Sequence, residues 1–286
     1  MTGGTDPVST APFEPRVALA SLSGRSDADW ARAAGELAGA AFLGGIALDG
    51  PTREAAREMV DRDRDEFLPA DPLAFVDEQL AALADAPLLA GFNVRASDPE
   101  SVREAAAICA ERGAVLEVNA HCRQSEMCAA GAGESLLREP DRLAEYVAAA
   151  AETGATVSVK VRTELAGVDL PAVAGRVGDA GADILHVDAM DSERVVADVV
   201  EATDAAVVAN NGVRDRETVR EYLAYGADAV SVGRPSDDPR VLRQVRAAVD
   251  EWFEGDSGDR NDRGGSGDPG DEPRRRARPT GGGSQP

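Results

Sequence analysis

The chain has 286 residues, and its 52 acidic and 30 basic residues give a formal net charge of −22. Hydrophobic residues make up 43 % of the sequence, which is enough for a sizeable core and excludes disorder over the whole length. Three cysteines are too few for a secreted disulfide framework, so we expect a reducing, cytoplasmic compartment. We expect no signal peptide and no membrane span, because no apolar run approaches roughly 20 residues.

The basic residues are almost all arginine, and Lys160 is the single lysine. Excess acid, scarce lysine and few aromatic residues are typical of halophilic proteins, in which hydrated carboxylates keep the surface soluble in concentrated salt. The acidity also argues against binding DNA or other nucleic acid through a broad basic face.

Strand-like runs alternate with amphipathic or alanine-rich stretches through most of the chain. Residues 1–15 are rich in Gly, Thr and Pro, and we expect them to be loose. The predicted strands are Val17–Ser21, Gly45–Leu48, Leu88–Val94, Val115–Asn119, Thr156–Arg162, Ile184–Asp188, Ala206–Asn210 and Asp228–Val232. Residues 254–286 lack apolar periodicity and are predicted to be a disordered acidic tail, in which we interpret the Arg274–Arg278 run as solvated.

The repeated strand–helix unit predicts an α/β fold with a parallel sheet. Eight units within residues 17–252 favour a (β/α)8 TIM barrel, whose usual length is about 250 residues. No Gly-x-Gly-x-x-Gly motif follows the first predicted strand, which disfavours a dinucleotide-binding Rossmann fold. We therefore predict one domain, a barrel over residues 16–253.

Four consecutive predicted strands place polar side chains on one face, because alternate residues of a strand share a side. These side chains are Asn93, Arg95, Glu117, Asn119, Ser158, Lys160, Arg162, His186 and Asp188. Each such group costs roughly 1–3 kcal/mol if it is buried without a partner, so the set needs mutual bonds or a polar ligand. We predict an active site at the C-terminal ends of the strands in preference to a structural polar plug.

Two residues near this face have reactive side chains. Lys160 is a compact donor whose pKa shifts readily, and its presence in an arginine-rich chain indicates a role that a guanidinium cannot fill. Cys122 lies beside His121 and Arg123 in the loop after the fourth predicted strand, where cations favour a titratable thiol. Cys109 is predicted to pack inside a helix, and no role is assigned to Cys128.

The seventh and eighth predicted strands end in glycine-containing turns, Asn210-Asn211-Gly212 and Gly233-Arg234-Pro235. Glycine lets backbone N–H groups approach an anion, and the corresponding loops of such barrels frequently bind phosphate. The two turns together predict a phosphate site.

From about residue 17 to residue 245, these motifs resemble the flavin-dependent tRNA-dihydrouridine synthase family and, more loosely, the FMN barrels related to dihydroorotate dehydrogenase. The matching segments are 92–99, 117–122, 131–137, 159–162, 209–212 and 226–234. The resemblance implies an oxidoreductase with FMN at the barrel top, reduced by NAD(P)H or another donor. It also implies a uracil-type ring as substrate, in tRNA or in a small pyrimidine.

The resemblance carries over to individual residues. It implies that reduced flavin delivers hydride to uracil C6 while Cys122 protonates C5. We also predict the adjacent His121, which the resemblance does not cover, as a catalytic residue. Lys160 matches the lysine of the family that contacts the flavin, and Asn93 stands where the family usually has Gln. The implied cofactor-binding residues are Asn93, Asn119, Lys160, Arg162, His186, Asp188, Asn210, Asn211, Gly212, Gly233 and Arg234.

The sequence departs from the family pattern in three places. The motif Asn-x-Gly-Cys-Pro becomes Asn119-Ala120-His121-Cys122-Arg123, and the flavin-contacting His of the sixth strand becomes Asp188, with His186 two residues earlier. We expect the short tail to stand where the family has a helical RNA-binding domain after the barrel. Two other functions therefore stay open: a Schiff-base aldolase or lyase that uses Lys160, and a non-catalytic barrel that binds a flavin or nucleotide.

Overall fold

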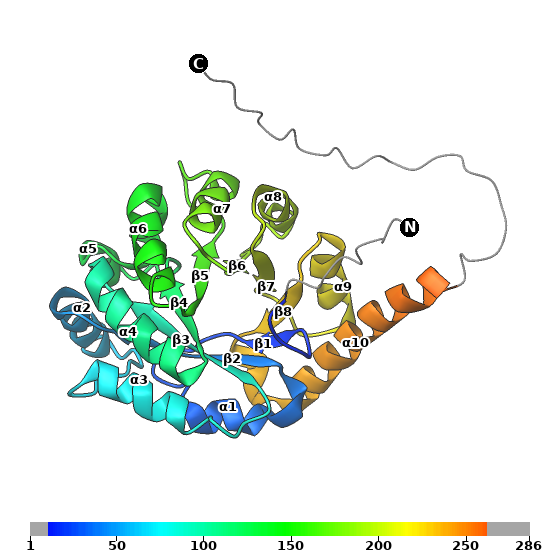
Figure 1. Cartoon of the computed structure of the whole chain (residues 1–286), viewed down its shortest axis with the longest axis horizontal. Helices are drawn as coiled ribbons and strands as arrows, with labels where there is room; N and C mark the ends of the chain where they lie inside the picture. Colours follow the sequence, from blue (N-terminus) through cyan, green and yellow to red (C-terminus); the bar gives the residue numbers. More distant parts are fainter. Residues whose placement is uncertain (1–10, 262–286) are drawn as a thin grey trace, which may run out of the picture. The chain divides into compact units, whose positions relative to one another are not determined.

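The computed structural model describes residues 11–261, with side chains for residues 11–254. Eight parallel strands close into a barrel in which each strand pairs with its sequence neighbours and β8 pairs with β1 (Figure 1). The predicted (β/α)8 barrel is thereby confirmed. The strands are β1 (Val17–Leu19), β2 (Ala40–Ala47), β3 (Leu89–Arg95), β4 (Val115–Asn119), β5 (Thr156–Arg162), β6 (Ile184–Asp188), β7 (Ala206–Asn210) and β8 (Ala229–Val232).

Four strands, β4 to β7, have the bounds that the sequence predicts, whereas the predicted start of β2 is wrong. β2 begins at Ala40 rather than at Gly45, and all of its residues are buried. Its first residues are Ala-Ala-Phe-Leu. Because alanine is depleted in strands, the intrinsic propensity of these residues does not predict the start of β2. Ladder pairing with both β1 and β3 overrides that weak propensity.

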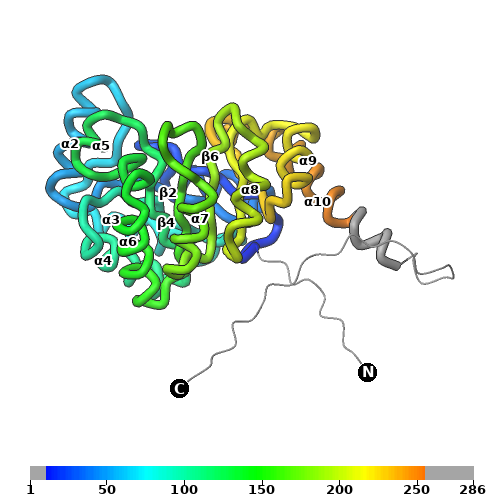
Figure 2. The backbone as a smooth tube through the Cα atoms, turned by 90° about the horizontal axis from the view of Figure 1, so that it is seen from above, coloured from blue at the N-terminus to red at the C-terminus, as the bar shows by residue number. Residues whose placement is uncertain are grey.

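Helices connect the strands and lie outside the barrel (Figure 2). Several begin at an aspartate whose side chain accepts a hydrogen bond from the first turn, as Asp49, Asp98 and Asp215 do. The α-helices are α1 (Ala28–Ala34), α2 (Gly50–Val60), α3 (Pro72–Ala81), α4 (Pro99–Arg112), α5 (Ser125–Ala129), α6 (Pro140–Ala151), α7 (Leu170–Asp179), α8 (Val195–Ala202), α9 (Arg216–Ala224) and α10 (Pro239–Asn261). Short 3-10 helices cover Gly35–Leu37 (η1), Gly133–Arg138 (η2) and Arg234–Asp237 (η3).

The segment before β1 closes the N-terminal end of the barrel. Phe13 is only 5 % exposed and packs in one cluster with Phe42 and with apolar residues near the starts of the other strands. An aromatic side chain gains free energy by leaving water, so Phe13 holds this part of the chain against the barrel, and the looseness of residues 1–15 stays a prediction. Residues 1–10 lie outside the described part.

The last described helix, α10, continues to Asn261, so the predicted boundary at Glu254 does not coincide with a helix end. No proline interrupts the sequence between Pro239 and Pro269, and a helix without proline loses no backbone donor. The chain divides into two compact units, residues 1–252 and residues 253–286. The Arg274–Arg278 run lies outside the described residues. Among the helices within residues 11–261, none is both long and apolar enough to cross a bilayer.

Candidate active site

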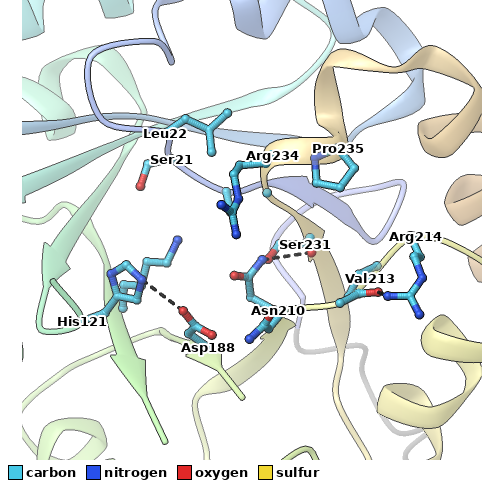
Figure 3. Close-up of a pocket in the computed structure, with 15 residues that line it drawn as sticks. Ser21, Leu22, His121, Asp188, Asn210, Val213, Arg214, Ser231, Arg234 and Pro235 are labelled. Atoms are coloured by element: carbon cyan, nitrogen blue, oxygen red, sulfur yellow. Dashed lines mark hydrogen bonds and ion pairs between the residues drawn. The ribbon is translucent and has the colours of Figure 1, made fainter. Parts of the chain in front are cut away.

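Two adjoining cavities lie at the C-terminal ends of the barrel strands. The β7–β8 cavity, about 400 Å³, is lined by the turns after β7 and β8 and by Lys160 (Figure 3). The Cys122 cavity, about 600 Å³, is lined by the loop after β4 and by the ends of β3 and β5. The residues that line both are Ser21, Leu22, His121, Asp188, Asn211 and Arg234. The two cavities therefore adjoin along these shared residues, and together they are called the barrel-top depression below.

Beneath this depression, Glu117 on β4 joins polar side chains from the neighbouring strands. Its carboxylate accepts hydrogen bonds from Asn93 Nδ2 at 2.7 Å and from Ser158 Oγ at 3.1 Å, and it contacts His186 Nδ1 at 2.7 Å. All four side chains are fully buried. Burial alone would raise the pKa of Glu117, but His186, Lys160 and the Asn93 bond outweigh burial and lower it to about 2. Part of the polar face therefore forms a satisfied floor under the site.

The floor continues toward β8 through His186. Burial lowers the pKa of His186, so the imidazole is neutral and donates through Nδ1–H to Glu117. Its Nε2 lies 2.7 Å from Ser231 Oγ, and this hydroxyl accepts a hydrogen bond from Asn210 Nδ2 at 2.8 Å. The chain of bonds links the buried carboxylate on β4 to Asn210, which lines the β7–β8 cavity.

In the other direction, the floor holds the loop that carries the thiol. Asn119 Nδ2 donates to Asn93 Oδ1 at 2.8 Å, which orients the Asn119 amide. Asn119 Oδ1 then accepts from the backbone N–H groups of His121 at 3.2 Å and Cys122 at 2.9 Å. The first turn of the loop is therefore positioned by buried amides rather than by the loop alone.

Lys160 extends from β5 into the β7–β8 cavity and is 2 % exposed. Burial lowers the pKa of this ammonium, and the charges of Glu117 and Asp188 offset only part of the effect. Among the hydrogen bonds and ion pairs of residues 11–254, none involves the Lys160 side chain. Its donors are therefore available to a ligand in the cavity.

His121 and Asp188 form a pair at the junction of the two cavities. His121 Nε2 lies 3.1 Å from Asp188 Oδ2 (Figure 3). Burial lowers the pKa of His121 despite this carboxylate, while His121 and Lys160 lower the pKa of Asp188 against the effect of burial. A neutral ring that donates from Nε2 leaves Nδ1 as an acceptor, and this buried atom has no partner within the described residues.

Cys122 lies in the other cavity, 9 % exposed, in a tightly packed loop. Its carbonyl oxygen accepts from the Glu134 N–H at 2.9 Å, and Gly133 packs so closely that a Cβ there would lie 2.3 Å from this oxygen. The buried Arg95 is held by Glu66 at 2.7 Å. Burial alone would lower the pKa of Arg95, but Cys122 and Glu66 raise it, which places the guanidinium in the field of the thiol.

The turns after β7 and β8 present backbone donors to the β7–β8 cavity. Within residues 11–261, no backbone acceptor bonds the N–H groups of Gly212, Gly233 or Arg234. Gly212 has φ +66°, and a Cβ on Gly233 would meet nothing within 4 Å. The Arg234 side chain points toward Asn210 (Figure 3). Free N–H groups beside a guanidinium are suited to bind an anion.

Most of the residues predicted to form the site line the two cavities. These are Asn119, His121, Cys122, Lys160, Arg162, Asp188, Asn210, Asn211, Gly212, Gly233 and Arg234. Asn93 and His186 lie in the floor instead, with their polar atoms bonded to protein groups. The sequence reasoning placed Glu117 on the inward polar face but assigned it no role in the site, and it did not single out Ser231, although strand alternation places both on that face.

The chain is similar to a protein family and to several known proteins. The family model described as dihydrouridine synthase matches residues 76–256. An uncharacterized protein of Methanocaldococcus jannaschii is 29 % identical over 78 % of this chain and 89 % of its own length. The tRNA-dihydrouridine synthase B of Proteus vulgaris is 28 % identical over 55 % of this chain, and the match spans 54 % of that enzyme. The catalytic subunit of a dihydroorotate dehydrogenase B (NAD(+)) of Methanothermobacter thermautotrophicus is 27 % identical over 71 % of this chain and 69 % of the subunit.

Solved structures resemble the barrel at lower sequence identity. A FabK variant from Thermotoga maritima has a TM-score of 0.53 at 16 % identity, covering 78 % of this chain and 62 % of its own. A chain of the tryptophan synthase complex from Pyrococcus furiosus has a TM-score of 0.52 at 15 % identity, with coverages of 83 % and 97 %. At these identities the likeness concerns the fold alone.

Proposed function

The chain belongs to the dihydrouridine synthase family, and from this premise we propose that it reduces the C5–C6 double bond of a uracil ring in tRNA. The family and the dihydroorotate dehydrogenase relative support a flavin-dependent oxidoreductase that acts on carbon–carbon bonds. The match to tRNA-dihydrouridine synthase B spans about half of that enzyme, and we propose tRNA as the substrate by analogy with it. The observation that carries it is the pair of adjoining cavities, with the Lys160 ammonium in one and the Cys122 thiol in the other.

The donors of the β7–β8 cavity suit FMN. The unbonded N–H groups of Gly212 and Gly233, together with Arg234, would hold the phosphate. The ammonium donors of Lys160 have no partner among the side chains and backbone that the structure describes, and they would bind electron-rich atoms of the ring system. FMN, reduced by NAD(P)H or another donor, supplies hydride chemistry when it is bound.

The remaining predicted site residues either contact the cofactor or substrate or position the residues that do. Asn119, Arg162 and Asp188 would contact the ring system or its substrate, and Asn210 and Asn211 would contact the sugar-alcohol chain and phosphate. Asn93 and His186 are assigned a positioning role, because their polar groups are engaged beneath the cavities.

In the Cys122 cavity, the thiol is proposed to protonate C5 of the uracil ring. Loss of that proton leaves a thiolate in a cavity whose lining also contains the buried Arg95 guanidinium. Asn119 holds the backbone of this loop and so fixes the height of the thiol above the floor. His121 Nδ1, which has no partner within the described residues, would accept a hydrogen bond from an N–H of the bound ring.

One observation favours a second candidate, a Schiff-base aldolase or lyase. Burial lowers the pKa of Lys160, and a neutral buried amine is a nucleophile toward carbonyl substrates. The two functions differ in whether the purified protein carries FMN and in whether borohydride traps a carbonyl substrate on Lys160.

The cofactor test separates these functions directly. Protein purified in high salt is denatured, and the released small molecules are identified by mass spectrometry. We expect one FMN per chain and no borohydride-stable adduct on Lys160 after incubation with sugar phosphates. A colourless protein that does not take up added FMN, with borohydride trapping of a substrate on Lys160, would establish the aldolase alternative.

A further inference from the structure

The Cys122 cavity is rich in arginine, although acidic residues outnumber basic ones 52 to 30 in the whole chain. Its lining contains six arginines and three aspartates. The arginines are Arg25, Arg64, Arg95, Arg123, Arg162 and Arg234, and the aspartates are Asp63, Asp65 and Asp188. The mouth of the candidate active site therefore reverses the charge balance of the molecule.

Half of these arginines already have a carboxylate partner at 2.7 Å. The pairs are Arg25 with Asp237, Arg95 with Glu66, and Arg162 with Glu134. Arg64, Arg123 and Arg234 make no ion pair and no side-chain hydrogen bond with any residue that the structure describes. All three are exposed, so their guanidinium groups can reach a ligand at the mouth, and the Arg64 charge also acts at longer range on Glu66 and Glu126.

Arg64 lies on a segment with a defined position. The backbone of Asp65 and Glu66 packs against Gly24, where a Cβ would lie 2.5 Å from the Asp65 carbonyl carbon. Glu66 anchors the same segment from below through its buried ion pair with Arg95. The connection between α2 and α3 is thus tied to the barrel at the two residues that directly follow Arg64.

The backbone at Arg123 is also held in place, because the residue before it is Cys122, the proposed proton donor, whose backbone is hydrogen-bonded. The Cys122 N–H bonds to the Asn119 side chain, and the Cys122 carbonyl accepts from the Glu134 N–H. Two backbone bonds on the preceding residue limit the freedom of Arg123 at the cavity rim.

We propose that Arg64 and Arg123 bind backbone phosphates of an RNA strand whose target nucleotide enters the Cys122 cavity. The inference rests on the proposed function and deepens it, since it identifies the groups that select a polynucleotide over a free pyrimidine base. A guanidinium matches a phosphate bidentately, and a neutral uracil ring gives these exposed cations nothing to bind. Arg234 lines both cavities, and we assign it to the cofactor phosphate rather than to the RNA.

The double variant R64Q/R123Q tests this role by binding and by kinetics. Affinity for an unmodified tRNA transcript is measured by fluorescence anisotropy at several potassium chloride concentrations. Loss of two single-strand phosphate contacts lowers the slope of log affinity against log salt by about 1.4. The KM for the transcript rises about tenfold or more, because hydrogen bonds to charged groups are lost, while the kcat changes little.

A matched control removes the same charge elsewhere. Arg194 at the start of α8 and Arg243 in α10 also lack ion pairs within the described residues, and neither lines the two cavities. We expect R194Q/R243Q to keep the slope, the KM and the kcat of the unmodified protein. Circular dichroism and FMN content verify that both variants are folded.

The outcomes separate the inference from the function on which it rests. Equal losses in both double variants, an unchanged slope in R64Q/R123Q, or no binding of the transcript by the unmodified protein would overturn the inference. If the protein forms dihydrouridine but the slope is unchanged, only the arginine assignment fails. If the slope changes as expected but no FMN is bound and no uracil is reduced, the proposed function fails while the RNA contact stands.

Discussion

At the residue scale, the proposed chemistry depends on two reactive side chains, Lys160 in the β7–β8 cavity and Cys122 in the adjoining cavity. Lys160 and Cys122 could be selected from composition and loop position, and both line the depression. The contact of His121 with Asp188 joins the loop after β4 to the end of β6, and no local pattern encodes such a pair. The sequence also shows two departures from the family motif at these two positions, and the structure brings them within 3.1 Å.

Replacement of the thiol tests its assigned role. We expect C122A to bind FMN as the unmodified protein does and to form dihydrouridine at least about 100-fold more slowly, because general-acid catalysis typically contributes that much. C128S is the matched control, since Cys128 lines neither cavity and serine keeps a donor for the Cys122 carbonyl. Full activity of C122A, measured by dihydrouridine analysis of the tRNA, would refute the role.

Replacement of the lysine tests the cofactor cavity. K160M removes the donors that face the β7–β8 cavity without leaving a void of the size that alanine would. We expect FMN to dissociate from this variant more readily during gel filtration, because the ammonium makes no hydrogen bond or ion pair with residues 11–254 and is proposed to act on the ligand. FMN content equal to that of the unmodified protein would show that Lys160 does not contact the cofactor.

At the element scale, alternation within β3 to β6 predicted which side chains face inward. It did not predict which of them lie in the buried floor and which lie at the cavity. Asn93, Glu117 and His186 satisfy one another in the floor, whereas Lys160 and Asp188 remain at the cavity. The division depends on how deep in the barrel each residue lies. That depth follows from the ladder register between strands, which a single sequence does not specify.

The floor makes stability depend on pH in the acid range. The pKa of Glu117 is about 2 in the fold against an ordinary value of 4.5, so ionised Glu117 stabilises the fold above pH 4.5, and this contribution is lost as pH falls toward 2. The linked free energy of unfolding is roughly 3 kcal/mol. We expect E117Q to be less stable at neutral pH and to lose less stability on acidification than the unmodified protein.

Chemical denaturation at a series of pH values measures this effect. E104Q serves as the control, because Glu104 is an exposed carboxylate on α4. An acid limb in E117Q as steep as that of E104Q would contradict the assigned charge of the floor.

A pair of glycine variants tests how the loop after β4 is packed. Gly113 and Gly133 both have positive φ, +63° and +64°, so alanine is strained at either position. A Cβ at Gly113 meets nothing within 4 Å, whereas at Gly133 it would strike the Cys122 carbonyl. We expect G113A to cost about 1 kcal/mol of unfolding free energy with activity retained. G133A is expected to cost more and to lower kcat, and equal effects of the two on kcat would contradict a positional role of this contact.

At the scale of the whole molecule, the barrel was predictable because eight strand–helix units repeat with few interruptions. The closure of its lower end was not, since Phe13 belongs to a segment of turn-forming composition and is recognisable as core only in three dimensions. Overall acidity similarly concealed the arginine-rich mouth, because Arg64, Arg123 and Arg234 come from separate loops.

The net charge of −22 predicts a stability that depends on salt. Raising ionic strength shortens the screening length from about 10 Å at 0.1 M to about 3 Å at 1 M, which weakens repulsion among carboxylates. We expect the unfolding temperature, followed by circular dichroism, to rise steadily with potassium chloride and much less with an equal osmolality of sucrose. A flat or falling dependence on potassium chloride would contradict the halophilic interpretation of the composition.

The decisive measurement is the oxidation of the reduced protein by RNA. FMN-loaded protein is reduced without oxygen and mixed with an unmodified tRNA transcript while flavin absorbance is recorded. We predict that the transcript restores the oxidised flavin spectrum and gains one dihydrouridine for each flavin oxidised. A flavin that stays reduced in the presence of tRNA, free uridine and uridine monophosphate would show that the barrel binds a cofactor without reducing a uracil ring.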